Sequence, residues 1–526
     1  MPSLYYTLVK DKNHLSLLLT IIVLIAFVVV GKGQSNVSPI AFTDASAKLP
    51  NNTTFSTWLQ KAVADMNNDG RDDIIRGNES DGFFIELQNA NGTFTEQALG
   101  RVTPGFTPLS VIIGDIDNNG FADILTGGQY SGVYIFKANN DASAYTLTRL
   151  PEDNIFTQAS AMADMNKDGL LDLFVCNDDS TNAVWRNTGN GNFVRDSTFF
   201  DFSNIPLTKR AGNYGIVFTD FNNDGKLDAY LSKCYGEEPT DSTALQRVNQ
   251  LFVNNGSGVL TDQALNFNMA DGRQTWVTEF QDIDNDGDMD ALIVNHGDAR
   301  SMSKMMLNDG TGHFTDITAS AGLDNMPKLS LQALMRDFDN DGYMDIIVAG
   351  ETAPKIYHNN GNANGALPSF TEIPTMPLYD PNGDNIILLR SFAIGDLNHD
   401  GFLDIYASYR FNRDAPDRLW LNNGNANHFL AVSLVGTKSN RSAVGARITV
   451  QMGNKTLTRE IRAGESYGLS STLTQTFGLG SQTQIDKLTI RWPSGLTETK
   501  TINQVDRFLT FAESDCQIKA PVLTKQ

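Results

Sequence analysis

The sequence predicts an all-β protein in which a seven-bladed β-propeller precedes a small C-terminal β domain. Three observations lead to this prediction: a nine-residue acidic motif occurs seven times, short β-branched runs flank its copies, and 44 glycines mark frequent turns. With 526 residues, the chain is longer than one hydrophobic core usually organises. A repeat array accounts for this length, because each unit buries its apolar face against its neighbours.

The motif is most complete in residues 282–290, which read Asp-Ile-Asp-Asn-Asp-Gly-Asp-Met-Asp. Side-chain oxygens stand at positions 1, 3, 5 and 9. Gly287 stands at position 6, where a chain bending around an ion needs a backbone conformation that is costly for other residues. Alternating oxygen donors with this glycine are typical of a calcium loop. We therefore predict up to seven Ca²⁺ sites.

The predicted ligands are the residues at positions 1, 3, 5 and 9 of the seven copies. They are Asp65, Asn67, Asp69 and Asp73 (loop one); Asp115, Asp117, Asn119 and Asp123 (loop two); Asp164, Asn166, Asp168 and Asp172 (loop three); Asp220, Asn222, Asp224 and Asp228 (loop four); Asp282, Asp284, Asp286 and Asp290 (loop five); Asp337, Asp339, Asp341 and Asp345 (loop six); Asp396, Asn398, Asp400 and Asp404 (loop seven).

An EF-hand is the first alternative, because it shares positions 1, 3, 5 and 6 of the motif. It also requires a glutamate at position 12 and flanking helices. Position 12 is occupied by Arg76, Thr126, Val175, Leu231, Ile293, Val348 and Ala407. The flanks read as strands, as in 111–114 and 345–349, so the motif predicts calcium-bound β-hairpins.

Each repeat reads as four strands. Successive motifs begin 49 to 62 residues apart, a spacing typical of a repeated supersecondary unit. One strand enters the loop and a second leaves it; a third ends in an Asn/Gly turn, as in 251–256, and a short fourth follows, as in 313–317. Four antiparallel strands repeated radially make a propeller blade. A linear stack of calcium repeats is the alternative, but such repeats are shorter and lack four strands.

The last repeat lacks a fourth strand of its own. Residues 42–49 echo the fourth-strand segment 314–323 of the fifth repeat. Because an open ring would leave unpaired strand edges, we expect residues 39–45 to pair with the strand around 419–421 and close the ring.

The repeats, over about residues 40–428, resemble the FG-GAP/VCBS family, which includes the blades of integrin α-subunits. Loop two departs from that family's motif through Asn119, which should weaken its site without abolishing it. After residue 428 the motif stops, and 429–435, 447–451 and 487–492 alternate like half-buried strands.

The segments that connect these strands resemble the ASPIC/UnbV domain. They are Ser439-Asn440-Arg441, Gly445-Ala446-Arg447, Gly464-Glu465-Ser466-Tyr467, Phe477-Gly478-Leu479-Gly480 and Trp492-Pro493-Ser494-Gly495. The combination is similar to the cartilage acidic protein family. That resemblance implies an extracellular calcium-binding protein and no agreed reaction.

The predicted organisation is a signal peptide at 1–33, the propeller at 34–428, the β domain at 429–512 and a tail at 513–526. Lys10 and Lys12 precede an apolar run of 16 residues, 15–30. This run is shorter than the roughly 20 residues of a membrane span, so a cleaved signal is favoured over an uncleaved anchor. We therefore predict a secreted or cell-surface protein.

The three cysteines are better explained as free thiols than as a disulfide framework. A bridge between Cys176 and Cys234 is conceivable, buried thiols are favoured, and Cys516 stands near the tail.

The predicted loops account for the formal net charge of −21, because their 23 ligand carboxylates outnumber the excess of acidic over basic residues in the whole chain. Basic residues are not clustered, so no nucleic-acid partner is expected. A membrane contact is expected only through an uncleaved anchor.

The string Gly464-Glu465-Ser466-Tyr467-Gly468 matches the G-x-S-x-G pattern of a nucleophile elbow, which needs a strand, a sharp turn and a helix. The residues that follow are rich in β-branched and turn types, so we predict a turn and no catalytic residue.

No string predicts a zinc site. Trp58, Trp185, Trp276 and Trp420 are expected in the core between blades more than as sugar platforms.

The predicted function is adhesion or recognition of an extracellular protein or glycan. A polysaccharide-acting hydrolase or lyase on the same scaffold is the alternative, since a catalytic carboxylate pair would be hidden among the loops. A purely structural module for a partner enzyme is a third reading.

Overall fold

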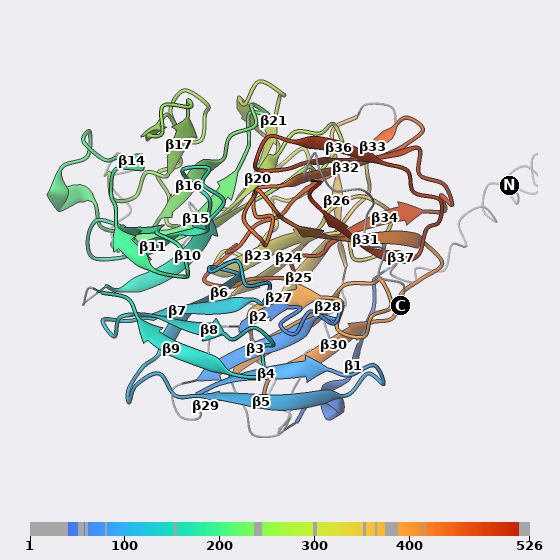
Figure 1. Ribbon diagram of the computed structural model, residues 1–526. Coiled ribbons are helices and arrows are strands. Elements are labelled where there is room, and N and C mark those ends of the chain that lie inside the picture. The colour runs from blue at the N-terminus through green and yellow to red at the C-terminus, as the bar shows by residue number, and fades with distance from the viewer. Residues whose placement is uncertain are drawn as a thin grey trace, which may run out of the picture. The chain divides into compact units, whose positions relative to one another are not determined.

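The computed structural model describes residues 40–50, 57, 61–78, 82–151, 155–235, 245–297, 302–350, 354–362, 366–373, 388–411, 413–414 and 416–514. Within these ranges the chain forms strands and two 3₁₀ turns, η1 (Ser46–Lys48) and η2 (Leu207–Lys209), with no α-helix (Figure 1). The predicted all-β fold is confirmed. The predicted signal and Cys516 lie outside these ranges, and no helix within them is long and apolar enough to cross a membrane.

Seven sheets follow one another along the described part of the chain, each with the four strands of the expected unit. The first three sheets are β2 (Lys61–Ala64), β3 (Asp73–Asn78), β4 (Gly82–Gln88) and β5 (Phe94–Gly100); β6 (Pro108–Gly114), β7 (Asp123–Gly128), β8 (Val133–Ala138) and β9 (Tyr145–Arg149); and β10 (Thr157–Ala163), β11 (Asp172–Asn177), β12 (Ala183–Asn187) and β13 (Phe193–Arg195).

The next three sheets are β15 (Asn213–Thr219), β16 (Asp228–Lys233), β17 (Gln250–Asn254) and β18 (Leu260–Asp262), extended by the parallel β14 (Phe200–Asp201); β19 (Thr275–Gln281), β20 (Asp290–Asn295), β21 (Lys304–Asn308) and β22 (Phe314–Asp316); and β23 (Ser330–Arg336), β24 (Asp345–Gly350), β25 (Lys355–Asn359) and β26 (Phe370–Ile373). The seventh contains β27 (Leu388–Gly395), β28 (Asp404–Phe411), β30 (Arg418–Asn422) and β1 (Phe42–Asp44), with β29 (Arg413–Asp414) beside β28.

The sheets succeed one another around an axis, as in a β-propeller. The first strand of each sheet contacts the first strand of the next, from β2 through β27, and β27 contacts β2. Neighbouring sheets share apolar clusters. Phe174 of the third sheet, for example, packs against Phe218 of the fourth and Phe200 of β14, which widens that sheet, in edge-to-face contacts.

The seventh sheet is completed by the N-terminal strand. β1 pairs antiparallel with β30, with Phe42 opposite Asn422 and Asp44 opposite Trp420. The expected pairing of residues 39–45 with the strand around 419–421 is confirmed for residues 41–45, while residue 39 lies outside the described ranges. A side-chain hydrogen bond also connects the first and seventh sheets. The Gln88 side-chain amide of the first sheet donates from Nε2 to the Asp396 carbonyl of the seventh at 3.2 Å.

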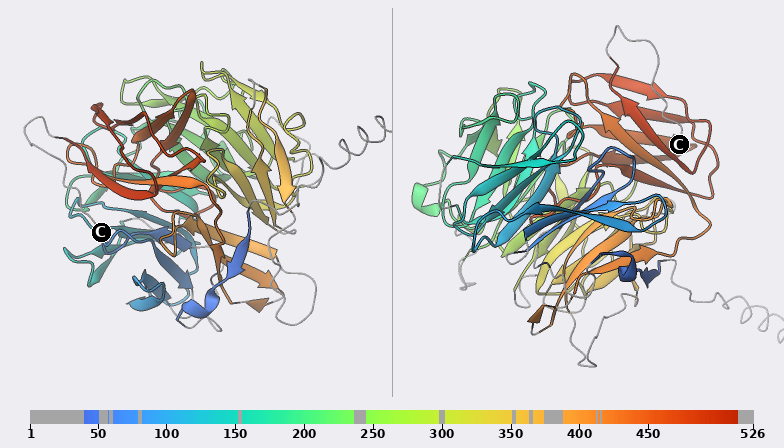
Figure 2. Two further views of the ribbon diagram at one scale, coloured as in Figure 1. Left: turned by 90° about the vertical axis from the view of Figure 1, so that its right-hand side faces the viewer. Right: turned by 60° about the horizontal axis from the view of Figure 1, so that its bottom comes forward.

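Two further sheets follow the seventh. One has the order β34 (Gln475–Gly480), β31 (His428–Val435), β37 (Arg507–Ala512), with β31 and β37 parallel; the other has the order β33 (Lys455–Glu460), β32 (Arg447–Met452), β35 (Lys487–Arg491), β36 (Thr497–Lys500). The three strands expected here from alternation are present as β31, β32 and β35. Figure 2 shows this group in orange to red.

Residues 460–472, which we call the axial segment, run from this C-terminal group along the first strands of the sheets. The segment forms hydrogen bonds to the first strand of every one of the seven sheets, including Val111 N–H to the Gly468 carbonyl at 2.8 Å and Met162 N–H to the Ala463 carbonyl at 2.8 Å. The bonded residues on the seven strands are Val63, Val111, Met162, Thr219, Phe280, Gln332 and Ile394. The C-terminal group thus sends one segment along the first strands of all seven sheets.

Candidate metal-binding loops

Each acidic motif forms the turn between the first and second strands of its sheet, and its position 9 begins the second strand. The backbone is left-handed twice in each turn. At position 4, φ lies between 56° (Asn340) and 63° (Asn285), and at the position-6 glycine between 82° (Gly225) and 97° (Gly287). Asparagine tolerates this conformation better than most residues and glycine adopts it freely, which explains their recurrence in the motif.

The same hydrogen bonds hold positions 1, 3 and 5 in all seven loops. In loop five, Asp282 accepts the Asp286 N–H on Oδ1 at 3.1 Å and the Gly287 N–H on Oδ2 at 3.2 Å. Asp284 Oδ1 accepts the Asp286 N–H at 3.3 Å, and Asp286 Oδ1 accepts the Asp288 N–H at 2.9 Å. These bonds turn the oxygens of positions 1, 3 and 5 toward the inside of one tight turn.

Position 9 joins the loop to the third strand. Its Oδ1 accepts a third-strand N–H in all seven loops; in loop five Asp290 accepts from Asn308 at 2.8 Å. Its Oδ2 accepts the N–H of position 2 in six loops, as Asp290 does from Ile283 at 3.0 Å. Loop four differs, because Asp228 Oδ2 is buried and has no hydrogen-bond partner among the described residues.

Burial raises the pKa of the position-9 carboxyls. Asp73 and Asp123 rise to about 8 and Asp228 to about 9, in each case chiefly because desolvation disfavours the charged form, with neighbouring loop carboxylates adding to it. At position 1, Asp282 and Asp337 rise to about 8 for the same reason. Without a cation, the loops therefore hold carboxylates that resist ionisation.

Carboxylate oxygens converge in several loops. The oxygens of positions 1, 3 and 9 lie within 4.8 Å of one another in loop two (Asp115, Asp117, Asp123), loop five (Asp282, Asp284, Asp290) and loop six (Asp337, Asp339, Asp345). These groups could hold a metal ion. Loops one, three, four and seven carry asparagine at position 3, whose amide oxygen takes the same place in the hydrogen-bond scheme.

The side chain of Asn119 fits into loop two at position 5. Its Oδ1 accepts the Phe121 N–H at 2.8 Å, as the aspartates do elsewhere, and its Nδ2 donates to the Ala138 carbonyl at 3.0 Å. The substitution therefore removes one charge from the loop without changing its path.

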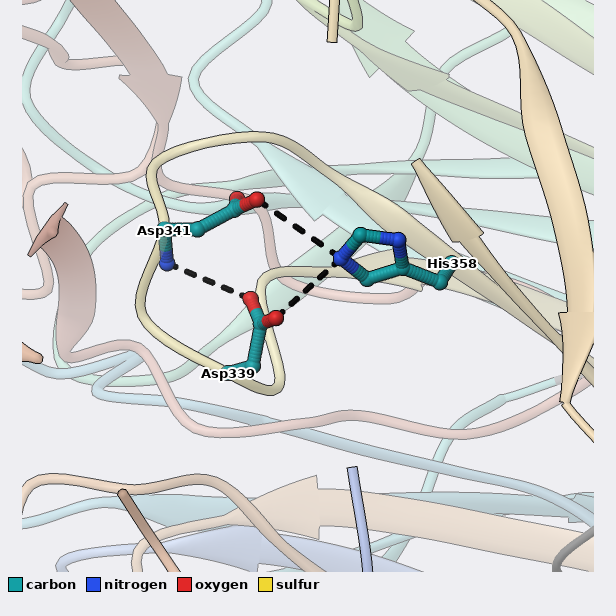
Figure 3. A group of neighbouring side chains, drawn as sticks. All are labelled: Asp339, Asp341 and His358. Atoms are coloured by element: carbon teal, nitrogen blue, oxygen red, sulfur yellow. Dashed lines mark hydrogen bonds and ion pairs between the residues drawn. The ribbon is translucent and has the colours of Figure 1, made fainter. Parts of the chain in front are cut away.

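A histidine that the motif does not include approaches loop six. His358, on β25, lies with Nε2 3.1 Å from Asp339 Oδ2 and 3.6 Å from Asp341 Oδ2 (Figure 3). Burial alone would lower the pKa of His358, but the hydrogen bonds to Asp339 and Asp341 raise it to about 11. Lys137, at the same place on the third strand of the second sheet, has Nζ 3.3 Å from Asp117 Oδ2. The sequence contained a signal for this contact: two of the repeats with aspartate at position 3 of their loops also have a basic residue just before the turn that ends the third strand, namely His358 and Lys137.

The side chains at position 4 reach neighbouring parts of the fold. Asn118 Nδ2 donates to the Gly169 carbonyl of the next loop at 3.0 Å, and Asn340 Nδ2 to the Gly401 carbonyl at 3.0 Å. The His399 ring stacks on Phe508 of β37 at a centroid distance of 3.7 Å. Because the left-handed residue projects its side chain sideways, position 4 connects each of loops one to six to the next loop.

The Gly464–Gly468 string lies in the axial segment. Glu465 and Leu469 bridge each other across a tight turn in which Ser466 has φ 46°. The Ser466 hydroxyl is buried and has no hydrogen-bond partner among the described residues, and no helix follows it. The turn expected here is confirmed, and the nucleophile elbow is absent from this described segment.

The tryptophans and cysteines fall largely where expected. Trp185 is fully buried and Trp420 nearly so, whereas Trp276 is half-buried with its ring 4.9 Å from that of Tyr467 in the axial segment. Cys176 and Cys234 are buried free thiols. Trp58 lies outside the described residues.

Comparison with known families agrees with this architecture. Residues 65–126, 164–231 and 337–407 match the FG-GAP-like repeat, and residues 436–518 match the family described as ASPIC and UnbV. The chain carries FG-GAP-like repeats and a C-terminal ASPIC and UnbV domain. Each repeat match begins at position 1 of one loop and extends through the following loop, so the matches include six of the seven loops.

Cartilage acidic protein 1 of Xenopus tropicalis is 24% identical to this chain over 309 residues, which are 57% of this chain and 44% of that protein. The chain therefore matches less than half of the relative's length. Among solved structures, an Agrocybe aegerita lectin that recognises non-reducing terminal N-acetylglucosamine is 18% identical with a TM-score of 0.42, covering 68% of this chain and 93% of the lectin. The exotype rhamnogalacturonan lyase YesX is 14% identical with a TM-score of 0.41, covering 69% of this chain and 72% of the lyase. These TM-scores are too low to assign a function.

Proposed function

We propose that the FG-GAP-like loops bind Ca²⁺ and that the ions stabilise an extracellular recognition protein. The observation that carries the proposal is the repetition of one donor arrangement in seven loops. In every loop, positions 1, 3, 5 and 9 present carboxylate or amide oxygens, and in three loops the carboxylates of positions 1, 3 and 9 lie within 4.8 Å of one another. A set made of oxygens alone suits a hard, large cation.

The electrostatics of the loops support the same ion. Desolvation by burial, with a smaller contribution from neighbouring carboxylates, raises the pKa of the Asp282 and Asp337 carboxyls, so a divalent cation would relieve both effects. Position 9 connects the ion to the third strand through Oδ1, which makes each ion a cross-link within its sheet. The ligands proposed are the residues at positions 1, 3, 5 and 9 given above.

Removing Ca²⁺ tests this proposal. We expect EDTA to lower the melting temperature clearly and calorimetric titration to show several bound Ca²⁺ ions, since extracellular modules typically bind at about 10⁻⁴ to 10⁻³ M. Asp282→Ala should lower the Ca²⁺-loaded melting temperature more than Asn119→Ala, because the buried Asp282 carries a loop charge and two loop hydrogen bonds. An unchanged melting curve on chelation would refute structural calcium.

We further propose that recognition uses the ends of the sheets away from the loops. The ASPIC and UnbV domain contacts the loop ends, for example where Arg441 N–H donates to Asn118 and Lys455 to the Asp341 carbonyl. At the opposite ends, half-buried Trp276 packs on Tyr467, and exposed Tyr130 packs on Phe156. Half-buried aromatic rings beside polar groups suit a protein or glycan ligand.

A glycan array and a binding screen with extracellular proteins, run with and without Ca²⁺, test this second part. Tyr130→Ala and Trp276→Ala should lower the affinity for any ligand found. Val194→Ala, at an exposed position on the outer strand β13, should leave that affinity unchanged. Equal binding by all three variants would place the ligand elsewhere.

A further inference from the structure

Loop four is held by the ASPIC and UnbV domain at its position-1 residue. The Arg491 guanidinium pairs with Asp220 Oδ2, the Arg447 Nη2 donates to the Asp220 carbonyl at 2.6 Å, and the Asp220 N–H donates to Glu460 Oε1 at 3.3 Å. The backbone and the carboxylate of this proposed ligand are thus both engaged by the C-terminal group.

A second feature sets loop four apart. Asp228, at position 9, is fully buried, and its Oδ2 has no partner among the described residues, whereas the same oxygen accepts the position-2 N–H in the other six loops. A buried carboxylate oxygen without a partner is costly, and a cation would satisfy it.

The charges of loop four are already partly neutralised by the protein. Arg491 pairs with Asp220, and Lys226 Nζ lies 2.5 Å from Asp224 Oδ2. A small cavity of about 30 Å³ is lined by Asp220, Arg491 and Trp492 among others. Because Ca²⁺ affinity depends on the number of ligand charges, loop four should bind the ion more weakly than its neighbours.

We propose that Arg491 and Ca²⁺ compete for Asp220, so that loop four is a low-affinity calcium site whose occupation loosens the contact between the ASPIC and UnbV domain and the fourth sheet. The proposal rests on the proposed calcium binding by the loops. Competition is reciprocal: what weakens the Arg491 contact strengthens calcium binding at loop four, and bound calcium weakens the Arg491 contact by the same factor.

The first experiment measures calcium binding to the full chain by flow dialysis. Arg491→Gln should tighten the weakest site by about tenfold, a usual size for such couplings. Arg491→Lys, which keeps the charge, should bind like the unsubstituted protein. Arg507→Gln is the matched control, since Arg507 lies on β37 and bonds the Gln504 side chain.

The second experiment follows amide hydrogen exchange in β35 during calcium titration. Exchange should rise as the weakest site fills, and Asp228→Asn, which impairs that site, should abolish the rise. Absence of calcium binding in every variant would refute the proposed function itself. Identical binding constants for the unsubstituted protein and Arg491→Gln, or exchange in β35 that does not change with calcium, would overturn the competition alone.

Discussion

At the residue scale, the aspartate at position 9 joins more of each sheet than any other loop residue. One carboxylate accepts an N–H from the third strand and, in six loops, one from position 2 as well, and it starts the second strand. Glycine at position 6 and the left-handed residue at position 4 give the turn its shape, while position 9 connects that turn to its sheet. Substitutions at positions 4 and 6 should therefore disturb the turn itself, whereas substitutions at position 9 should weaken its connection to the sheet.

Asp290→Asn should lower the stability of the Ca²⁺-loaded protein by about 1–3 kcal/mol, because it removes a charged acceptor from two buried hydrogen bonds and from a proposed ion site. Chemical denaturation with calcium present measures this. Asp309→Asn, in an exposed turn of the same sheet, is the control and should change little. Equal effects of the two substitutions would contradict the role given to position 9.

The raised pKa values predict how metal-free protein responds to pH. Asp73 and Asp123 have pKa values of about 8 in the fold, above their ordinary value of 3.8, so folding favours their protonated forms. The stability that protonation supplies is complete below the ordinary value and is lost as pH rises through about 8. In EDTA, the melting temperature should fall between pH 5 and 8.5, and excess Ca²⁺ should remove most of that fall. A flat profile in EDTA would show that these carboxyls are ionised in the metal-free fold.

At the scale of elements, the axial segment is the main link between the two kinds of sheet. Its charged side chains are paired with oppositely charged neighbours. Burial alone would raise the pKa of Glu460, but Arg447 and Arg462 lower this pKa to about 2. Arg336 of β23 pairs with Glu465 over 2.6 Å. Removing one partner of such a buried pair costs more than the pair contributes, so the segment is sensitive to single changes.

Gly468→Ala and Ser466→Ala should separate backbone from side-chain requirements in this segment. Gly468 has φ 65°, and a Cβ there would lie 2.3 Å from the Leu109 carbonyl oxygen, so alanine should cost well over about 1 kcal/mol. The Ser466 hydroxyl has no partner in the described part of the chain, so its removal should leave the melting temperature nearly unchanged and retain any activity that the protein has. Loss of a hydrolase activity in folded Ser466→Ala would show that the serine is a nucleophile.

At the scale of the whole molecule, both ends of the sheet array come together through β1. The seventh sheet takes its outer strand from the start of the described chain and its other strands from residues 388–422. Gln88 and Asp72 add hydrogen bonds from the first sheet to Asp396 of the seventh. Because the seventh sheet takes strands from both ends of the array and is bonded to the first sheet, loss of β1 should affect more than one sheet.

Deletion of residues 34–48 should therefore destabilise all the sheets together. We expect one cooperative unfolding transition at a lower temperature, measured by calorimetry with hydrogen exchange to locate the loss. Increased exchange confined to β30 and β28, with the other sheets protected as before, would show that the join contributes only locally.

Much of the fold and of the loops could be predicted from the sequence because their determinants are local. The donors, the left-handed turn positions and the strands they connect lie within one repeat, and the repetition makes the pattern unmistakable. The closing strand was also predictable, because residues 42–49 repeat a segment whose place was known from the fifth unit.

The remaining features depend on which distant residues meet in space. The path of the axial segment and the approach of Arg491 to Asp220 bring together residues that lie far apart in the sequence. The sequence of the axial segment does not by itself indicate that it will contact the first strands of seven sheets. Only the tertiary structure decided these contacts, because burial beside particular charges, and not local spacing, determines the partner of each such side chain.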